Sequence, residues 1–382
     1  MYVYLCFKTL IRISYFNDKF IGLLIGKGNI HELGFGVTSN NYHFGPVKNP
    51  VNPKLISGGN SGGAAVAVAT GIAKIGIGVD TFGSCRIPAS LCGTYGFKPT
   101  YGRYALNGVV PISYTADSIG IITNRIEDIV VIDSILTTGQ DKRRRGSLDE
   151  PGIFRVWPQK IRLGVCKNYF YEHLSNDVAF CISGILQKLS NDENIELVCV
   201  DTGGIDKCMT TGLDLYHHEI SRDLPKFLQD NKTGVSFEKL VDKLASPDVR
   251  LKMTKLLECQ NVIENDELYM SSLSERSLLL DFYRAIFKDN NIDALIFPTT
   301  PIEAKPYEGN VQSVQVDGKI VPTFDIYSQN TFTAAFAGLP SITLPLVKTP
   351  QNLPVGITLE CDKGNDRYLF EIAAAVRDTI LK

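Results

Sequence analysis

Short apolar runs that alternate with helical patterns are the feature that most restricts the fold of this chain. Six runs rich in Ile, Val and Leu are typical of buried strands: residues 75–80, 161–166, 195–200, 292–297, 341–346 and 355–359. Segments with helical periodicity lie between them: residues 61–74, 126–138, 177–190, 272–288 and 366–381. Strands separated by helices favour a mixed or largely parallel sheet with helices on both faces. We therefore predict a single large α/β/α domain, although 382 residues would also accommodate two or three domains.

Charge balance and cysteine pattern limit the classes of partner. The 39 basic and 41 acidic residues give a net charge of -2, which argues against nucleic acid or an anionic membrane as the main partner. No run approaches the roughly 18 uninterrupted apolar residues that a membrane-spanning helix needs. The nine cysteines include no Cys-x-x-Cys pair, so neither a zinc site nor a disulfide framework is expected. Because scattered thiols suit a reducing compartment, we predict a cytoplasmic protein without metal or cofactor, and leave a homodimer open.

Three segments depart from the alternating pattern. Residues 139–158 are predicted to be a linker, and the three consecutive arginines that begin at Arg143 a solvated loop rather than a nucleic-acid contact. Residues 205–275 are polar, charged and helical in pattern, which fits either an inserted helical cap or peripheral helices. Residues 1–16 are apolar but are interrupted by basic residues and lack a cleavage site. We interpret them as folded or fraying protein rather than as a signal peptide.

Residues 57–103 contain the motifs that point to chemistry. A glycine-rich loop at 57–63 precedes a helix of small residues, so its N–H groups and the helix N-terminus suit a phosphate, carboxylate or oxyanion. The loop lacks the lysine of a Walker phosphate loop and the glycine spacing of a dinucleotide-binding turn. Further on, Ser84 follows Gly83 just after a predicted strand, where a hydroxyl can lie beside successive N–H groups, as in a nucleophile with an oxyanion hole. For the glycine-rich loop alone, the alternative is a tight turn against a closely packed helix.

Charged residues near the same turn are interpreted as structural. Asp80 and Arg86 are close enough in sequence to pair and stiffen the turn, and we favour a buried ion pair with no chemical role. His217, His218 and Glu219 could suggest a metal site. Adjacent residues of a helix point about 100° apart, so they make a poor pair of ligands and we expect no metal there.

Taken together, these motifs resemble the amidase signature family. The resemblance begins at residues 26–36, where members typically have Gly-Lys-Thr-Asn-Met-His-Glu, and continues through residues 57–103 and 113–120. It resumes at residues 293–301 and ends with residues 337–341 and 353–357. It implies the α/β/α fold of that family, and hydrolysis of the C–N bond of small carboxamides through a serine acyl-enzyme without a cofactor. Within the family the sequence is most similar to hydrolases of aryl-acetamides such as mandelamide or indoleacetamide.

The resemblance assigns roles to the central block. Ser84 matches the nucleophile, and the N–H groups of Thr81, Phe82, Gly83 and Ser84 would form the oxyanion hole. Members mostly carry glycine where this chain has Phe82. The backbone donor survives that change, but the ring is expected to crowd the acyl position or to require different backbone angles. His31, in the first motif, is expected to be a hydrogen-bonded core residue.

Two parts of the family's proton relay do not match. Members use a Lys that deprotonates a bridging Ser in a cis peptide, and this Ser in turn deprotonates the nucleophile. The bridging Ser falls on Asn60, whose amide cannot shuttle a proton as a hydroxyl does, and Ser61 matches the position after it. The catalytic Lys lies farther upstream than this chain extends. Residues 1–382 would thus form an amidase-like domain without the family's N-terminal segment.

Such a chain is expected to hydrolyse amides very slowly or not at all. One alternative is a catalytically inactive homologue that binds a ligand or nothing. A second is the A subunit of a tRNA-dependent amidotransferase, which the sequence of residues 102–118 disfavours.

Overall fold

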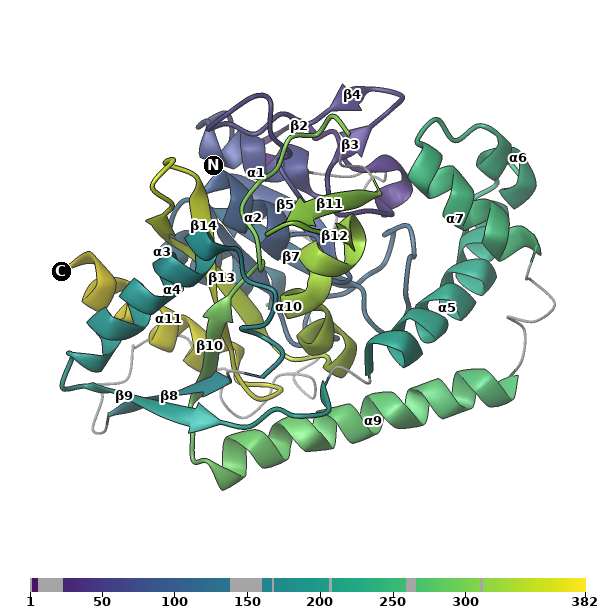
Figure 1. Ribbon diagram of the computed structural model, residues 1–382. Helices are drawn as coiled ribbons and strands as arrows, with labels where there is room; N and C mark the ends of the chain where they lie inside the picture. The colour runs from purple at the N-terminus through teal and green to yellow at the C-terminus, as the bar shows by residue number, and fades with distance from the viewer. Residues whose placement is uncertain are drawn as a thin grey trace.

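A mixed sheet of ten strands forms the centre of the molecule (Figure 1). The computed structural model describes residues 2–5, 23–137, 160–166, 168–205, 208–258, 266–309 and 312–382. The strand order is β2-β1-β5-β7-β6-β13-β14-β10-β8-β9. These strands are β1 (Tyr2–Leu5), β2 (Leu23–Lys27), β5 (Ile75–Asp80), β6 (Tyr95–Lys98), β7 (Ser118–Thr123), β8 (Ile161–Cys166), β9 (Ile195–Val200), β10 (Ala294–Pro298), β13 (Ser341–Lys348) and β14 (Pro354–Glu360). Neighbours are parallel at the two edges and antiparallel between β5 and β10, which confirms the predicted mixed sheet.

Helices cover both faces of this sheet, as the alternation of apolar runs predicted. On one face, α3 (Ile126–Thr137), α4 (Asn176–Ser190) and α11 (Asp366–Leu381) share a core with β5, β13 and β14. On the other face, α1 (Gly62–Ala69) and α2 (Arg86–Cys92) pack against β7, and α10 (Thr323–Ala337) lies beside α2. The α/β/α arrangement is therefore confirmed.

Alternating Ile and Gly residues in β5 explain how α1 comes so close to the sheet. The Ile and Val side chains of β5 point into the core on the α3 and α11 face. Gly76 and Gly78 point to the α1 face, where a Cβ on Gly76 would lie 3.1 Å from the Cβ of Ala64 and one on Gly78 would collide with the Oγ of Ser61. A larger residue at either position would push α1 away from the strand. The glycine-rich loop is thereby held beside the end of β5.

Four further helices form a layer beside the sheet. They are α5 (Cys208–Asp230), α6 (Phe237–Asp242), α7 (Pro247–Glu258) and α9 (Asp266–Asp289), and Figure 1 shows α9 running along the lower edge of the view. Their apolar side chains share one core cluster with Leu295 and Phe297 of β10 and Phe332 of α10. The helical pattern at 205–275 is thus found where the structure describes it, and its function as a cap stays a prediction.

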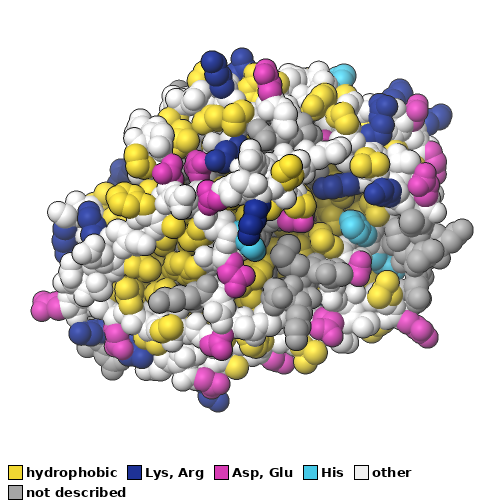
Figure 2. All heavy atoms as spheres, in the orientation of Figure 1, with side chains coloured by type: hydrophobic (Ala, Val, Ile, Leu, Met, Phe, Trp, Pro, Cys, Tyr) yellow, Lys and Arg dark blue, Asp and Glu magenta, His cyan; other side chains and the backbone are white. Residues whose placement is uncertain are grey.

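Two short hairpins lie outside the main sheet. Two hairpins pair β3 (Asn40–Asn41) with β4 (Gly45–Pro46) and β11 (Ser313–Val316) with β12 (Lys319–Pro322). None of the helices in the described ranges is long and apolar enough to cross a membrane. On the face shown in Figure 2, basic and acidic side chains are interspersed. The predicted linker at 139–158, with its three arginines, lies outside the described residues, as does most of the segment 1–16.

Candidate active site

Two loops that are distant in sequence adjoin at the end of β5. The N–H of Ser61 donates to the carbonyl oxygen of Ser84 at 3.0 Å, and the N–H of Gly59 donates to Val37 O at 2.6 Å. Gly59 has a φ of +57°, and a Cβ there would lie only 2.8 Å from the Ser84 oxygen. A side chain at position 59 would therefore separate the loops. The structure thus places Asn60 and Ser84 in adjoining backbone segments, as the site prediction requires.

Ser84 lies in a turn that only glycine can complete. Gly83 has a φ of +108°, and a Cβ on it would collide with Oγ1 of Thr331 in α10. The Thr331 hydroxyl in turn donates to the carbonyl oxygen of Phe82 at 2.7 Å, which fixes the turn from the side of α10. Ser84 is partly exposed, and its hydroxyl makes no hydrogen bond with any residue that the structure describes. It is therefore free to meet a substrate.

Three of the four predicted oxyanion donors have no partner within the described ranges: the N–H groups of Thr81, Phe82 and Ser84. The fourth differs, because the N–H of Gly83 donates to Oδ1 of Asp80 at 2.7 Å. The predicted set of donors is thus reduced to three in this conformation. Three N–H groups beside one hydroxyl are still sufficient to hold an oxyanion.

Asp80 shapes this turn with both of its carboxylate oxygens. Oδ1 accepts from Nη2 of Arg86 at 2.9 Å as well as from Gly83, and Oδ2 accepts from the N–H groups of Cys85 and Arg86. Burial alone would raise the pKa of Asp80, but the Arg86 guanidinium and these hydrogen bonds hold it below its ordinary value. Asp80 and Arg86 form a fully buried ion pair, from which Arg86 also donates to the Thr331 carbonyl and Asp80 holds the N–H groups on both sides of Ser84.

Two buried serines, Ser39 and Ser61, contact the glycine-rich loop and the residues beside it. Ser61 is fully buried ahead of α1, and its hydroxyl accepts a weak bond from the Cys85 thiol at 3.6 Å. Sequence reasoning missed Ser39, whose buried hydroxyl lies within 3.2 Å of three loop carbonyls, those of residues 58, 59 and 60, and accepts from the N–H of Gly62. Ser39 lies well upstream in the chain, so no local signal marked it.

Asn60 is buried in the position of the bridging residue. Its Oδ1 has no hydrogen-bond partner among the described residues, and its amide lies against Gly34, where a Cβ would come within 3.0 Å of Nδ2. The described residues contain no cis peptide bond, unlike the cis peptide that the resemblance implied for this position. Among the described residues, no series of hydrogen bonds through position 60 links a base to the Ser84 hydroxyl.

A second pair of buried charges lies near Asp80 and Arg86. Lys98 in β6 is fully buried and donates to Pro99 O at 2.9 Å, and burial lowers its pKa to about 7. Glu360 in β14 lies 3.8 Å from Arg86, and burial raises its pKa to about 7. Lys98 was missed as a single charge among apolar residues. Within the described part of the chain, no hydrogen bond joins Lys98 to Ser84.

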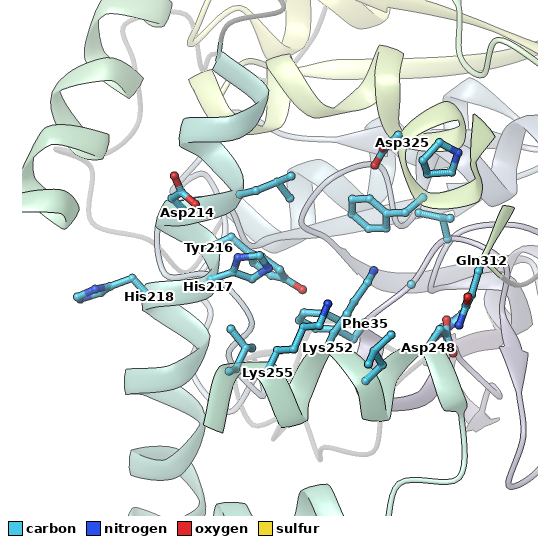
Figure 3. A pocket seen from close by; sticks show the side chains of 18 of the residues that line it. Phe35, Asp214, Tyr216, His217, His218, Asp248, Lys252, Lys255, Gln312 and Asp325 are labelled. Carbon is cyan, nitrogen blue, oxygen red and sulfur yellow. The ribbon is translucent and has the colours of Figure 1, made fainter. Parts of the chain in front are cut away.

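A cavity of about 630 Å³ lies between α5, α7 and the segment that follows β2 (Figure 3). Phe35 and Tyr216 form an aromatic wall, and Lys252 and Lys255 extend from α7 toward the His217 side of α5. The ammonium of Lys252 lies 5.5 Å from the centre of the Phe35 ring. Neither Ser84 nor Asn60 lines this cavity. It suits a small organic ligand in size and lining, yet it does not open onto the candidate nucleophile.

Histidines near this cavity are not arranged as metal ligands. His217 and His218 both line the cavity, but their side chains extend in different directions, as expected for neighbours on a helix (Figure 3). No group of three potential metal ligands occurs in the part of the chain that the structure describes. His31 is buried, with Nε2 at 3.0 Å from Oδ2 of Asp248 and Nδ1 at 3.4 Å from the Thr38 hydroxyl. It is a hydrogen-bonded core residue, as its motif predicted.

Four aromatic rings form a series of contacts that includes the cavity wall and Phe82 of the Ser84 turn. Phe35 stacks on Tyr216 at 5.1 Å, and Tyr216 meets the edge of Phe82 at 5.1 Å. Phe82 in turn stacks on Phe332 of α10 at 4.5 Å and 25°. All four rings are buried in one core cluster. We refer to these four residues as the ring partition.

Comparison with known proteins agrees with this geometry. The amidase family model matches residues 22–370. The chain is 38% identical over 354 residues to an indoleacetamide hydrolase of Agrobacterium vitis, covering 92% of this chain and 73% of that protein. It is 33% identical over 369 residues to a mandelamide hydrolase of Pseudomonas putida, covering 92% and 68% respectively. A crystal structure of an amidase superposes with a TM-score of 0.75 at 29% identity, covering 92% of this chain and 73% of the other.

Proposed function

Because the chain belongs to the amidase family, we propose that it hydrolyses the C–N bond of small carboxamides through an acyl-enzyme on Ser84. The observation that carries this proposal is the turn itself. A partly exposed serine hydroxyl without a partner lies beside three N–H groups without partners, those of Thr81, Phe82 and Ser84. Because two relatives are named for indoleacetamide and mandelamide, both amides belong among the substrates to be tested.

The chemistry follows from these groups. The Ser84 oxygen attacks the amide carbon, and the three N–H groups hold the oxygen that becomes negatively charged. The hydroxyl proton passes to water, the leaving nitrogen takes a proton from water, and ammonia departs. Water then attacks the ester on Ser84, which releases the carboxylic acid and restores the hydroxyl. Each step needs only the substrate, water and the residues of the turn.

We expect turnover by this route to be slow, because none of the residues that the structure describes gives the Ser84 hydroxyl a hydrogen-bonded base. Asn60 can hold a proton donor or acceptor in place but cannot relay a proton. In serine hydrolases, an oxyanion hole and substrate binding without the relay retain about 10³–10⁴ of the rate advantage over water. Loss of nucleophile activation costs up to about 10⁶ in kcat.

The test is release of ammonia from acetamide, benzamide, mandelamide and indoleacetamide over long incubations. Ser84→Ala should abolish the release above the rate in buffer. Ser183→Ala, an exposed serine of α4, is the matched control and should retain the full rate. A rate that survives Ser84→Ala would assign the chemistry to another residue. Complete absence of release from every amide would favour the inactive homologue.

A further inference from the structure

We propose that the ring of Phe82 separates the aromatic cavity from the nucleophile and so determines which acyl groups reach Ser84. This inference rests on the proposed function only in taking Ser84 as the reacting residue. It assigns a substrate class: the chain as it stands accepts short aliphatic acyl groups at Ser84 and excludes aromatic ones. Indoleacetamide and mandelamide would then be poor substrates.

The position of Phe82 within the ring partition is the first argument. Phe35 and Tyr216 line the cavity, whereas Phe82 and Phe332 do not. Contacts run from Tyr216 to Phe82 at 5.1 Å, and Phe82 lies two residues before Ser84. Phe82 thus contacts the cavity wall through its ring and belongs to the short turn that carries the reacting hydroxyl.

The surroundings of the ring are the second argument. Phe82 stacks on Phe332 and meets Tyr216 edge-on, the two arrangements that aromatic rings prefer. Removing its ring would leave a space bordered by the rings of Phe332 and Tyr216. Such a space selects the ring of an arylacetamide, whose carbonyl would extend from it toward Ser84. Phe82 therefore occupies a site that suits an aromatic acyl group.

Backbone geometry is the third argument. Phe82 does not have a positive φ, unlike Gly83 beside it. Phe82→Ala can therefore be made without straining the turn, and the N–H of residue 82 stays in place. The side chain and the oxyanion donor can be varied independently.

The experiment measures access to position 84 rather than turnover. In a Ser84→Cys background, the introduced thiol loses its proton to the buffer. The resulting thiolate displaces iodide from iodoacetamide or bromide from phenacyl bromide. Peptide mapping by mass spectrometry follows alkylation at position 84 separately from the other cysteines. The ratio of the phenacyl bromide rate to the iodoacetamide rate reports on the exclusion of rings. Because no hydrolysis is needed, this ratio and the Ser84→Ala assay can fail independently.

We expect Phe82→Ala to raise the ratio at least tenfold. The matched control is Phe336→Ala, which removes a buried ring of the same cluster whose centre lies 6.2 Å from that of Phe332 and which lies outside the ring partition. It should leave the ratio unchanged. Phe82→Leu keeps an apolar side chain and should raise the ratio less. This variant allows the ratio to be measured if Phe82→Ala does not fold.

Three results would overturn the proposal. The first is an unchanged ratio in a folded Phe82 variant. The second is an equal rise in Phe336→Ala, which would indicate general loosening of the core. The third is absence of alkylation by iodoacetamide in every background, because position 84 would then be closed to all reagents and not to rings alone.

Discussion

At the scale of single residues, Asn60 interrupts the chemistry that the turn would otherwise support. Asn60→Ser restores a hydroxyl at the bridging position, but it should raise the rate of ammonia release less than tenfold. The reason is that this change supplies no base, whose contribution is roughly 10²–10⁴ in rate. Steady-state rates with acetamide test this, with Asn60→Ala as the control. A gain of a hundredfold or more would mean that another residue already serves as base.

Asp80 should be the residue on which the turn depends most. Asp80→Asn leaves the buried Arg86 with only Glu360, at 3.8 Å, as an acidic partner, and breaking a buried pair costs about 3–5 kcal/mol in the free energy of unfolding. Urea denaturation measures this loss. Asp281→Asn, which removes the exposed partner of Arg284, is the control and should change nothing measurable. Equal stability of the two variants would show that the buried pair contributes little.

At the scale of elements, Asp117 joins the end of β5 to the loop before β7. Its carboxylate accepts from Thr81 Oγ1 at 2.7 Å and from the N–H groups of Ile112 and Ser113. Burial raises its pKa from 3.8 to about 7, and the nearby charge of Glu219 adds to the rise. Because the folded-state pKa lies above the unfolded value, the folded state holds the proton more tightly.

The protonated Asp117 carboxyl therefore contributes its full share to the free energy of unfolding below about pH 4. This contribution is lost as the pH rises to about 7. Asp117→Asn removes the titration while keeping a carbonyl acceptor. It should flatten the dependence of the unfolding free energy on pH between 4 and 7. Urea denaturation at several pH values measures the slope, with Asp281→Asn as the variant that should keep it. If Asp117→Asn had the same slope as the unmodified protein, the titrating group would be a residue other than Asp117.

Elements differ in how far the sequence could predict them. All six predicted strands are present, because each is an apolar run bounded by turn residues. Strands β6 and β7 were missed, since they are short and fall within the block that was interpreted for its chemistry. Helix α10 was missed as well, because it is buried on almost every side and rich in Ser, Thr, Asn and Gln, so it lacks an amphipathic period. The ring partition depends on side chains from four distant segments, which no local pattern reveals.

At the scale of the whole molecule, the helical layer and the sheet share one apolar core. The cluster that contains α5, α7 and α9 also includes side chains of β10 and α10. We therefore expect one unfolding transition in urea, with near-ultraviolet and far-ultraviolet circular dichroism changing together. Phe336→Ala should lower the midpoint without splitting the transition. Two separate transitions would show that the helical layer folds as an independent unit.

If Ser84 is the nucleophile, its hydroxyl should react covalently with a small sulfonyl fluoride. Methanesulfonyl fluoride is small and has no ring, so the ring partition should not exclude it. Attack by Ser84 forms an O–S bond and releases fluoride, with the hydroxyl proton passing to water. Mass spectrometry should find one sulfonyl group on the peptide that contains Ser84, present in Ser183→Ala and absent in Ser84→Ala. A label on another serine that persists in Ser84→Ala would contradict the account.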